Sequence, residues 1–159
     1  MENLEYYIDF DGVILDSQDR FLDAMGSSTD LDEWMDYLAS LEWKKFLREC
    51  NEIDNSISTL DELQKYRKLK GIITQIHCFN EGKEKLLFLR ERGIIVPVIY
   101  VLPEQRKSSV IIPNKNLVLV DDKVRNCKQW TNDGGSSLQF DPHSTGNEKG
   151  KIKSLKQLL

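Results

Sequence analysis

Two aspartates near the start of the chain are the first residues whose types and spacing suggest chemistry. Asp9 and Asp11 end the apolar run 4–10, which includes two tyrosines and predicts a buried strand. Ligands of open α/β sheets bind beyond the carboxyl ends of the strands, and paired carboxylates there can hold a hard cation, since Mg²⁺ prefers oxygen ligands. The alternative is an acidic turn that caps a helix beginning near Ser17.

Further polar residues follow later apolar runs. Thr74 and the pair Asp121-Asp122 each end such a run, and Lys107 lies in a polar stretch between them. Taken one at a time, each has a structural explanation: a β-branched strand residue, a turn or cap, and a solvated loop lysine. Their functional interpretation therefore depends on whether the fold brings them to one place.

The apolar pattern predicts which elements position these residues. From 17 to 70 the apolar residues follow the spacing of amphipathic helices, as in Trp43, Phe46, Leu47 and Cys50. The rest alternates between strands and helices. The expected strands are 4–10, 72–76, 94–101, 117–120 and 137–140, with helices at 81–92, after 124 and after Ser154.

Strands that alternate with helices imply a parallel sheet covered on both faces. We therefore predict an α/β core formed by residues 1–16 and 71–159. The helical block 17–70 is an insert after the first strand, and its charged, amphipathic helices suit a small cap over one end of the sheet.

Composition narrows the classes of partner. The chain has 159 residues and a net charge of -4, with no basic block, which disfavours binding to a nucleic-acid polymer. Its apolar runs are too short to span a bilayer, and its first residues do not resemble a secretory signal. The three cysteines are far apart, so we expect reduced thiols in a cytoplasmic protein. The sequence gives no indication of the oligomeric state.

The segment Asp9-Phe10-Asp11-Gly12-Val13, with Asp16-Ser17 after it, resembles the first motif of the haloacid dehalogenase (HAD) superfamily of phosphohydrolases. The remaining motif residues follow in the family's order as Thr74, Lys107 and Asp121-Asp122, although Arg106 and Lys115 compete with Lys107. The resemblance implies a Rossmann-like core with a five-stranded parallel sheet in the order 5-4-1-2-3. It also places the insert 17–70 at the position of a C1-type cap.

The resemblance further implies a mechanism. Asp9 would attack phosphorus and form an aspartyl phosphate, and Asp11 would act as general acid and then general base. Thr74 and Lys107, with Gln75 beside Thr74, would bind the phosphoryl oxygens. The implied ligands of a Mg²⁺ ion are Asp9, the backbone carbonyl of Asp11, and one or both of Asp121 and Asp122.

A narrower resemblance concerns the substrate. The C-terminal third is similar to the 5'(3')-deoxyribonucleotidase branch, in which an acidic pair precedes an Asn, a Trp, two glycines and a short strand. The corresponding residues are Asp121-Asp122-Lys123, Asn126, Trp130, Gly134-Gly135 and Leu138-Gln139-Phe140. This implies a nucleoside monophosphate or another small phosphate ester as substrate. The segment Gln75-Ile76-His77 departs from that branch, which has small residues and a proline there.

Two other classes of protein share some of these residues. A phospho-acceptor receiver domain also uses acids, a threonine and a lysine around a parallel sheet, but its acid pair comes first, and it lacks a helical insert of this kind. A degenerate HAD-like protein would bind a phosphate ester without turning it over. All the expected polar residues are present, which favours the hydrolase.

Overall fold

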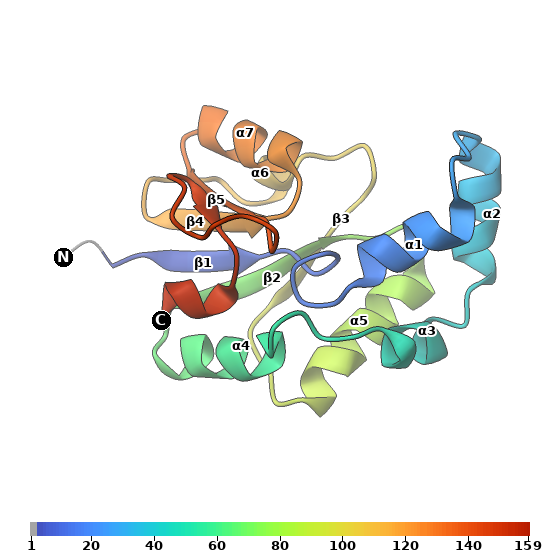
Figure 1. Cartoon of the computed structure of the whole chain (residues 1–159), viewed down its shortest axis with the longest axis horizontal. Coiled ribbons are helices and arrows are strands. Elements are labelled where there is room, and N and C mark those ends of the chain that lie inside the picture. Colours follow the sequence, from blue (N-terminus) through green and yellow to red (C-terminus); the bar gives the residue numbers. More distant parts are fainter. Residues whose placement is uncertain (1–2) are drawn as a thin grey trace.

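In the computed structural model, which describes residues 3–159, a parallel sheet forms the centre of the molecule (Figure 1). Its strands lie in the order β3-β2-β1-β4-β5-β6. They are β1 (Glu5–Ile8), β2 (Leu69–Gln75), β3 (Val98–Val101), β4 (Leu117–Asp121), β5 (Ser136–Phe140) and β6 (Lys151–Ile152). Every neighbouring pair is parallel, and the winding reverses between β1 and β4.

The prediction of five strands was wrong, because the sheet has six. The order of the first five agrees with the predicted one, and β6 extends the sheet beyond β5. This last strand pairs only Lys151 with Gln139 and Ile152 with Phe140. A strand of two residues shows no alternation of apolar and polar side chains, so the sequence pattern could not reveal it.

Helices cover both faces of the sheet and its carboxyl end. Figure 1 shows α6 and α7 on one face, α4, α5 and the terminal helix η1 on the other, and α1 and α2 beyond the carboxyl ends of the strands. The helices are α1 (Ser17–Met25), α2 (Leu31–Ser40), α3 (Trp43–Glu49), α4 (Ser56–Lys65), α5 (Phe79–Glu91), α6 (Lys107–Val110), α7 (Val124–Asn132) and the 3₁₀ helix η1 (Leu155–Leu158).

The core follows from the alternation of side chains along the strands. In β1, Ile8 faces the larger cluster, which includes Leu60 of α4 and Leu89 of α5. Its neighbour Tyr7 faces the opposite cluster, where Trp130 of α7 is fully buried. Both faces are therefore apolar, as expected for a central parallel strand.

The inserted helices divide into two groups. Phe21, Leu38 and Trp43 from α1, α2 and α3 form a small core of their own, whereas α4 contributes Leu60 and Leu63 to the core beneath the sheet. The segment that carries α1, α2 and α3 begins and ends at adjacent points of the backbone, where Asp16 N–H donates to the Asn51 carbonyl at 3.0 Å. The cap boundaries 17–70 stay a prediction.

Among residues 3–159, no helix combines the length and the apolar character needed to cross a membrane.

Candidate active site

The loop after β1 turns sharply at the carboxyl end of the sheet. The Phe10 carbonyl accepts the Ile14 N–H at 2.9 Å, which curls the chain back on itself. Gly12 has a φ of +78°, and a Cβ at this position would clash with the carboxylate of Asp122. Glycine therefore allows the loop that carries Asp9 and Asp11 to lie against the loop that follows β4.

Lys107 joins these two loops. Its Nζ donates to Asp9 Oδ1 at 2.7 Å and to Asp121 Oδ2 at 2.7 Å, and the side chain is buried. Burial would lower the pKa of Lys107, but the two carboxylates raise it above its ordinary value, so the ammonium stays charged. The two competitors, Arg106 and Lys115, are exposed, and Lys115 precedes β4 at its amino end.

Three carboxylates meet beside this lysine. Asp9, Asp121 and Asp122 each offer an oxygen, and these oxygens lie within 4.8 Å of one another. Burial and the neighbouring Asp121 raise the pKa of Asp9 to about 8. The same two causes raise the pKa of Asp122 to about 6. One ammonium does not offset three carboxylates, of which Asp9 and Asp121 are buried and Asp122 is partly buried, so the cluster favours a further cation.

The free oxygens suit a metal ion. The Oδ1 atom of Asp122 is buried without a hydrogen-bond partner. Asp121 is already engaged, because Oδ1 accepts the Lys123 N–H at 2.9 Å and Oδ2 accepts from Asn126 Nδ2 at 2.9 Å as well as from Lys107. An all-carboxylate donor set is the kind that Mg²⁺ prefers. These residues therefore fit a hard divalent cation.

The side chain of Asp11 contacts other residues than those of the acidic cluster. Its Oδ1 accepts from Ser17 Oγ at 2.6 Å and its Oδ2 from Lys85 Nζ at 2.7 Å. The Lys85 ammonium also donates to Thr74 Oγ1 at 3.1 Å. The side chain of Asp11 is thus separate from the acidic cluster and is linked to Thr74 through a lysine.

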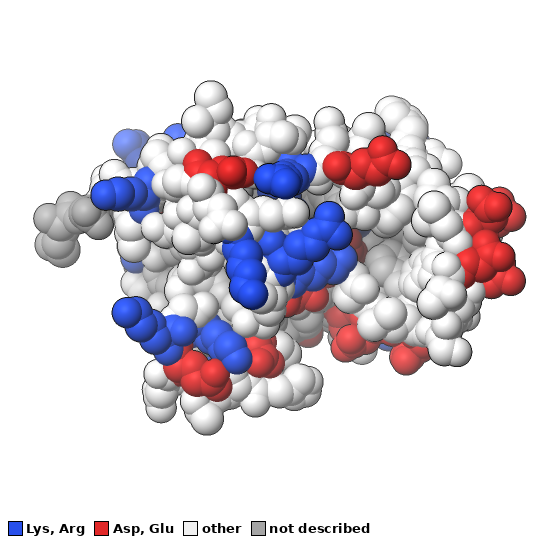
Figure 2. Space-filling model, turned by 90° about the horizontal axis from the view of Figure 1, so that it is seen from above, with Lys and Arg blue, Asp and Glu red and all other residues white. Residues whose placement is uncertain are grey.

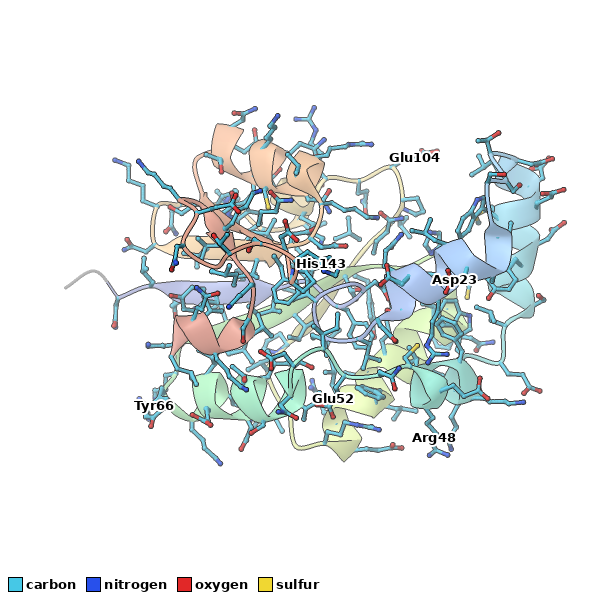
Figure 3. All side chains as sticks on the ribbon, in the orientation of Figure 1. Asp23, Arg48, Glu52, Tyr66, Glu104 and His143 are labelled. Atoms are coloured by element: carbon cyan, nitrogen blue, oxygen red, sulfur yellow. The ribbon has the colours of Figure 1, made fainter. Side chains whose placement is uncertain are left out.

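A cavity of about 110 Å³ opens over these residues. Four predicted site residues line it: Asp9, Asp11, Gln75 and Lys107. Thr74 is fully buried and does not line the cavity. Helices α1 and α2 close the other side with Phe21, Trp34 and Leu38. Figure 3 shows the surrounding side chains, with Asp23 on α1 and Glu104 on the loop after β3 at this end of the sheet.

Solved structures share the fold of this protein over nearly the whole chain. A HAD-superfamily hydrolase from Ehrlichia chaffeensis is 12% identical, with a TM-score of 0.54, and the match covers 97% of this chain and 93% of that one. A HAD hydrolase of family IA, variant 3, from Entamoeba histolytica HM-1:IMSS is 9% identical, with a TM-score of 0.60, over 98% of this chain and 95% of that one. No family model and no curated protein matches the sequence. This chain has the HAD fold.

The HAD fold explains why distant residues meet. Asp9 follows β1, Gln75 ends β2 and Asp121 ends β4, and these three strands are neighbours in the sheet. Carboxyl ends of parallel strands lie at one edge, and the reversal of winding between β1 and β4 opens a crevice there. Lys107 reaches the same edge from the start of α6.

Sequence reasoning did not identify the buried pair Glu81 and Lys85 on α5. Both side chains are fully buried, and Lys85 contacts Asp11 and Thr74 directly. Their spacing of four residues is typical of exposed ion pairs on a helix surface, so it carried no sign of burial. The one available signal was their position directly after β2, on the helix that follows Thr74.

Proposed function

We propose that this chain is a Mg²⁺-dependent phosphomonoester hydrolase that forms an aspartyl phosphate on Asp9. The observation that carries the proposal is the position of Asp9, which lines the cavity, contacts Lys107 and lies in the carboxylate cluster with Asp121 and Asp122. A buried nucleophilic carboxylate beside an ammonium and a cation-binding cluster suits attack on an anionic phosphorus centre.

The reaction would proceed in two steps. In the first, a carboxylate oxygen of Asp9 attacks phosphorus, the bond to the leaving oxygen breaks, and Asp11 gives that oxygen a proton. In the second, Asp11 takes a proton from water, which attacks the aspartyl phosphate and releases inorganic phosphate. Lys107 and Gln75 line the cavity and would contact the phosphoryl oxygens, and Thr74 supports the same site from beneath.

The metal would be held by Asp9 and Asp122, with Asp121 beside them and the backbone carbonyl of Asp11 as a further ligand. We assign direct binding to Asp122 because its Oδ1 has no other partner, whereas Asp121 already accepts three hydrogen bonds. When bound, Mg²⁺ supplies positive charge that offsets the repulsion of the acids and neutralises the phosphate.

Positive charge also lies on the exposed surface of the protein, at the cavity and on α7. Lys123 lines the cavity and is exposed, and Arg125 and Lys128 are exposed on α7. Figure 2 views the molecule from the α7 side and shows Lys and Arg side chains gathered on that face. Such a patch would draw an anionic substrate toward the cavity, although the whole chain has a net charge of -4.

The cavity size favours a small phosphate ester as substrate. Its volume of about 110 Å³ is below the roughly 300–1,000 Å³ of drug-sized ligand sites. A nucleoside monophosphate is the second candidate, supported by the aromatic rings of Phe21 and Trp34 in the cavity wall. It requires α1 and α2 to move away from the sheet.

A phosphate-release screen tests the proposal. Purified protein is incubated with sugar phosphates, short alkyl and aryl phosphates and nucleoside monophosphates, with Mg²⁺ or with EDTA. We expect Mg²⁺-dependent release of phosphate, lost in Asp9→Asn. Absence of turnover across the panel, together with Mg²⁺-dependent binding of inorganic phosphate, would instead support a degenerate binding protein. Release that persists in excess EDTA would contradict the proposed chemistry.

A further inference from the structure

Lys85 is a fully buried lysine to which the proposed mechanism assigns no role. Four oxygens surround its Nζ: Asp11 Oδ2 at 2.7 Å, Glu81 Oε1 at 2.9 Å, Thr74 Oγ1 at 3.1 Å and the Gln75 carbonyl at 3.2 Å. Lysine is almost never fully buried unless it is paired, because removing its charge from water is costly. Burial would lower the pKa of Lys85, but Asp11 and Glu81 raise it above its ordinary value, so it stays an ammonium.

Glu81 fixes this lysine from the other side. It is fully buried, and its Oε2 accepts the backbone N–H of His77 at 2.6 Å and the ring Nδ1–H at 3.1 Å. Burial would raise the pKa of Glu81, yet the hydrogen bonds from His77 and the charge of Lys85 hold it below its ordinary value. Glu81 is therefore a carboxylate that holds Lys85 and the start of the segment after β2 together.

The network ends at the cavity. His77 Nε2 lies 3.2 Å from the amide nitrogen of Gln75, and both side chains line the cavity. Because the Glu81 carboxylate accepts from Nδ1, the neutral ring offers Nε2 as an acceptor for the Gln75 amide. One connected set of side chains thus runs from Asp11 through Lys85, Glu81 and His77 to Gln75.

We propose that Lys85 is a positioning residue that holds the Asp11 carboxyl group and the Thr74 hydroxyl in the places that phosphoryl transfer requires. This inference rests on the proposed function. One ammonium touches both groups, so it fixes their separation. Ser17 restrains the other oxygen of Asp11 at 2.6 Å, and the carboxyl group is therefore held at both oxygens. A purely apolar residue would fill the same volume without the cost of a buried charge, which argues for a role beyond packing.

The leaving group provides the test. An alkyl oxygen needs a proton as it departs, whereas a nitrophenyl oxygen leaves without one, so misplacing the general acid harms the alkyl ester more. We measure kcat/KM of Lys85→Met for an alkyl phosphate and for p-nitrophenyl phosphate, because kcat/KM reports the first step. We expect a loss at least tenfold larger for the alkyl ester. Lys83→Met, an exposed lysine on the same helix, is the matched control and should leave both values unchanged.

A double variant separates positioning from charge balance. Lys85→Met leaves Glu81 and Asp11 without their counter-ion, and Lys85→Met/Glu81→Gln removes one of these two charges. We expect the double variant to regain thermal stability relative to Lys85→Met without regaining activity on the alkyl ester. Equal losses for both esters, recovery of alkyl-ester activity in the double variant, or its failure to fold would each overturn the positioning role. A wild-type protein inactive on every ester would contradict the proposed function itself.

Discussion

Gly12 lies directly against the carboxylate of Asp122, so the loop after β1 and the loop after β4 meet without a side chain between them. This contact brings the backbone beside Asp11 to the edge of the acidic cluster formed by Asp9, Asp121 and Asp122. The geometry of the proposed metal site therefore depends on the absence of a Cβ at one position.

A Gly12→Ala substitution should separate two effects. Alanine at a positive φ costs about 1–2 kcal/mol wherever it occurs, and at Gly12 it also displaces Asp122. Gly93 provides the control, because its φ of +79° is nearly the same and nothing lies within 4 Å of its missing Cβ. We expect both variants to lose similar thermal stability, and only Gly12→Ala to lose Mg²⁺-dependent activity, by at least tenfold. Equal activity in the two variants would show that the contact has no role at the site.

The roles of the two aspartates after β4 should differ. Asp122→Asn should raise the Mg²⁺ concentration that gives half-maximal activity by at least tenfold, because it replaces the unpartnered oxygen of a direct ligand. Asp121→Asn should act mainly through Lys107, which loses one of its two charged partners. We expect it to lower kcat and thermal stability with a smaller change in Mg²⁺ affinity. Titrations of activity with Mg²⁺ check both predictions. A larger loss of Mg²⁺ affinity in Asp121→Asn than in Asp122→Asn would assign direct metal binding to Asp121 instead.

Metal-free protein should become less stable as the pH rises. The pKa of Asp9 is about 8 in the folded protein, against roughly 3.9 in an unfolded chain. Between these values the folded state binds more protons than the unfolded state, so the free energy of unfolding falls with increasing pH. In EDTA, the melting temperature of Asp9→Asn minus that of the wild type should therefore increase as the pH rises from 5 to 8.

Mg²⁺ should reduce the pH-dependent difference in melting temperature between Asp9→Asn and the wild type, because the ion favours the ionised form of Asp9. Melting curves at four or five pH values, with EDTA and with Mg²⁺, check the prediction. A constant difference between the wild type and Asp9→Asn across this range in EDTA would show that Asp9 titrates normally in the folded protein.

The site of phosphorylation should distinguish a hydrolase from a receiver-type phospho-acceptor. We expect transient label on Asp9 when the protein is quenched during turnover of a phosphomonoester, and repeated release of phosphate. Acid quenching followed by peptide mapping identifies the labelled residue. Long-lived label on Asp121 or Asp122 from an activated donor, with no hydrolysis of monoesters, would support the receiver instead.

The sequence alone predicted which polar residues end the strands and that these strands are parallel. These two facts bring Asp9, Asp121 and Asp122 together, because the carboxyl ends of neighbouring parallel strands lie at one edge of the sheet. Lys107 reaches the same edge from the start of α6. The order of the first five strands was predicted from the resemblance to the HAD superfamily, not from the apolar pattern. The three aspartates could be predicted from the sequence because they follow apolar runs that the sequence displays. Lys107 lies in a polar stretch, and its role was predicted only from the resemblance.

Other features were decided only by tertiary packing. Glu81 and Lys85 have the spacing of a surface ion pair, and only the packing of α5 in the folded protein buries them and brings Lys85 against Asp11. Leu60 and Leu63 likewise lie on the apolar face of an amphipathic helix. The sequence of that helix does not indicate that this face packs into the core beneath the sheet. Periodicity specifies which face of an element is apolar or charged, but the surface that this face meets is set by contacts between residues far apart in the chain.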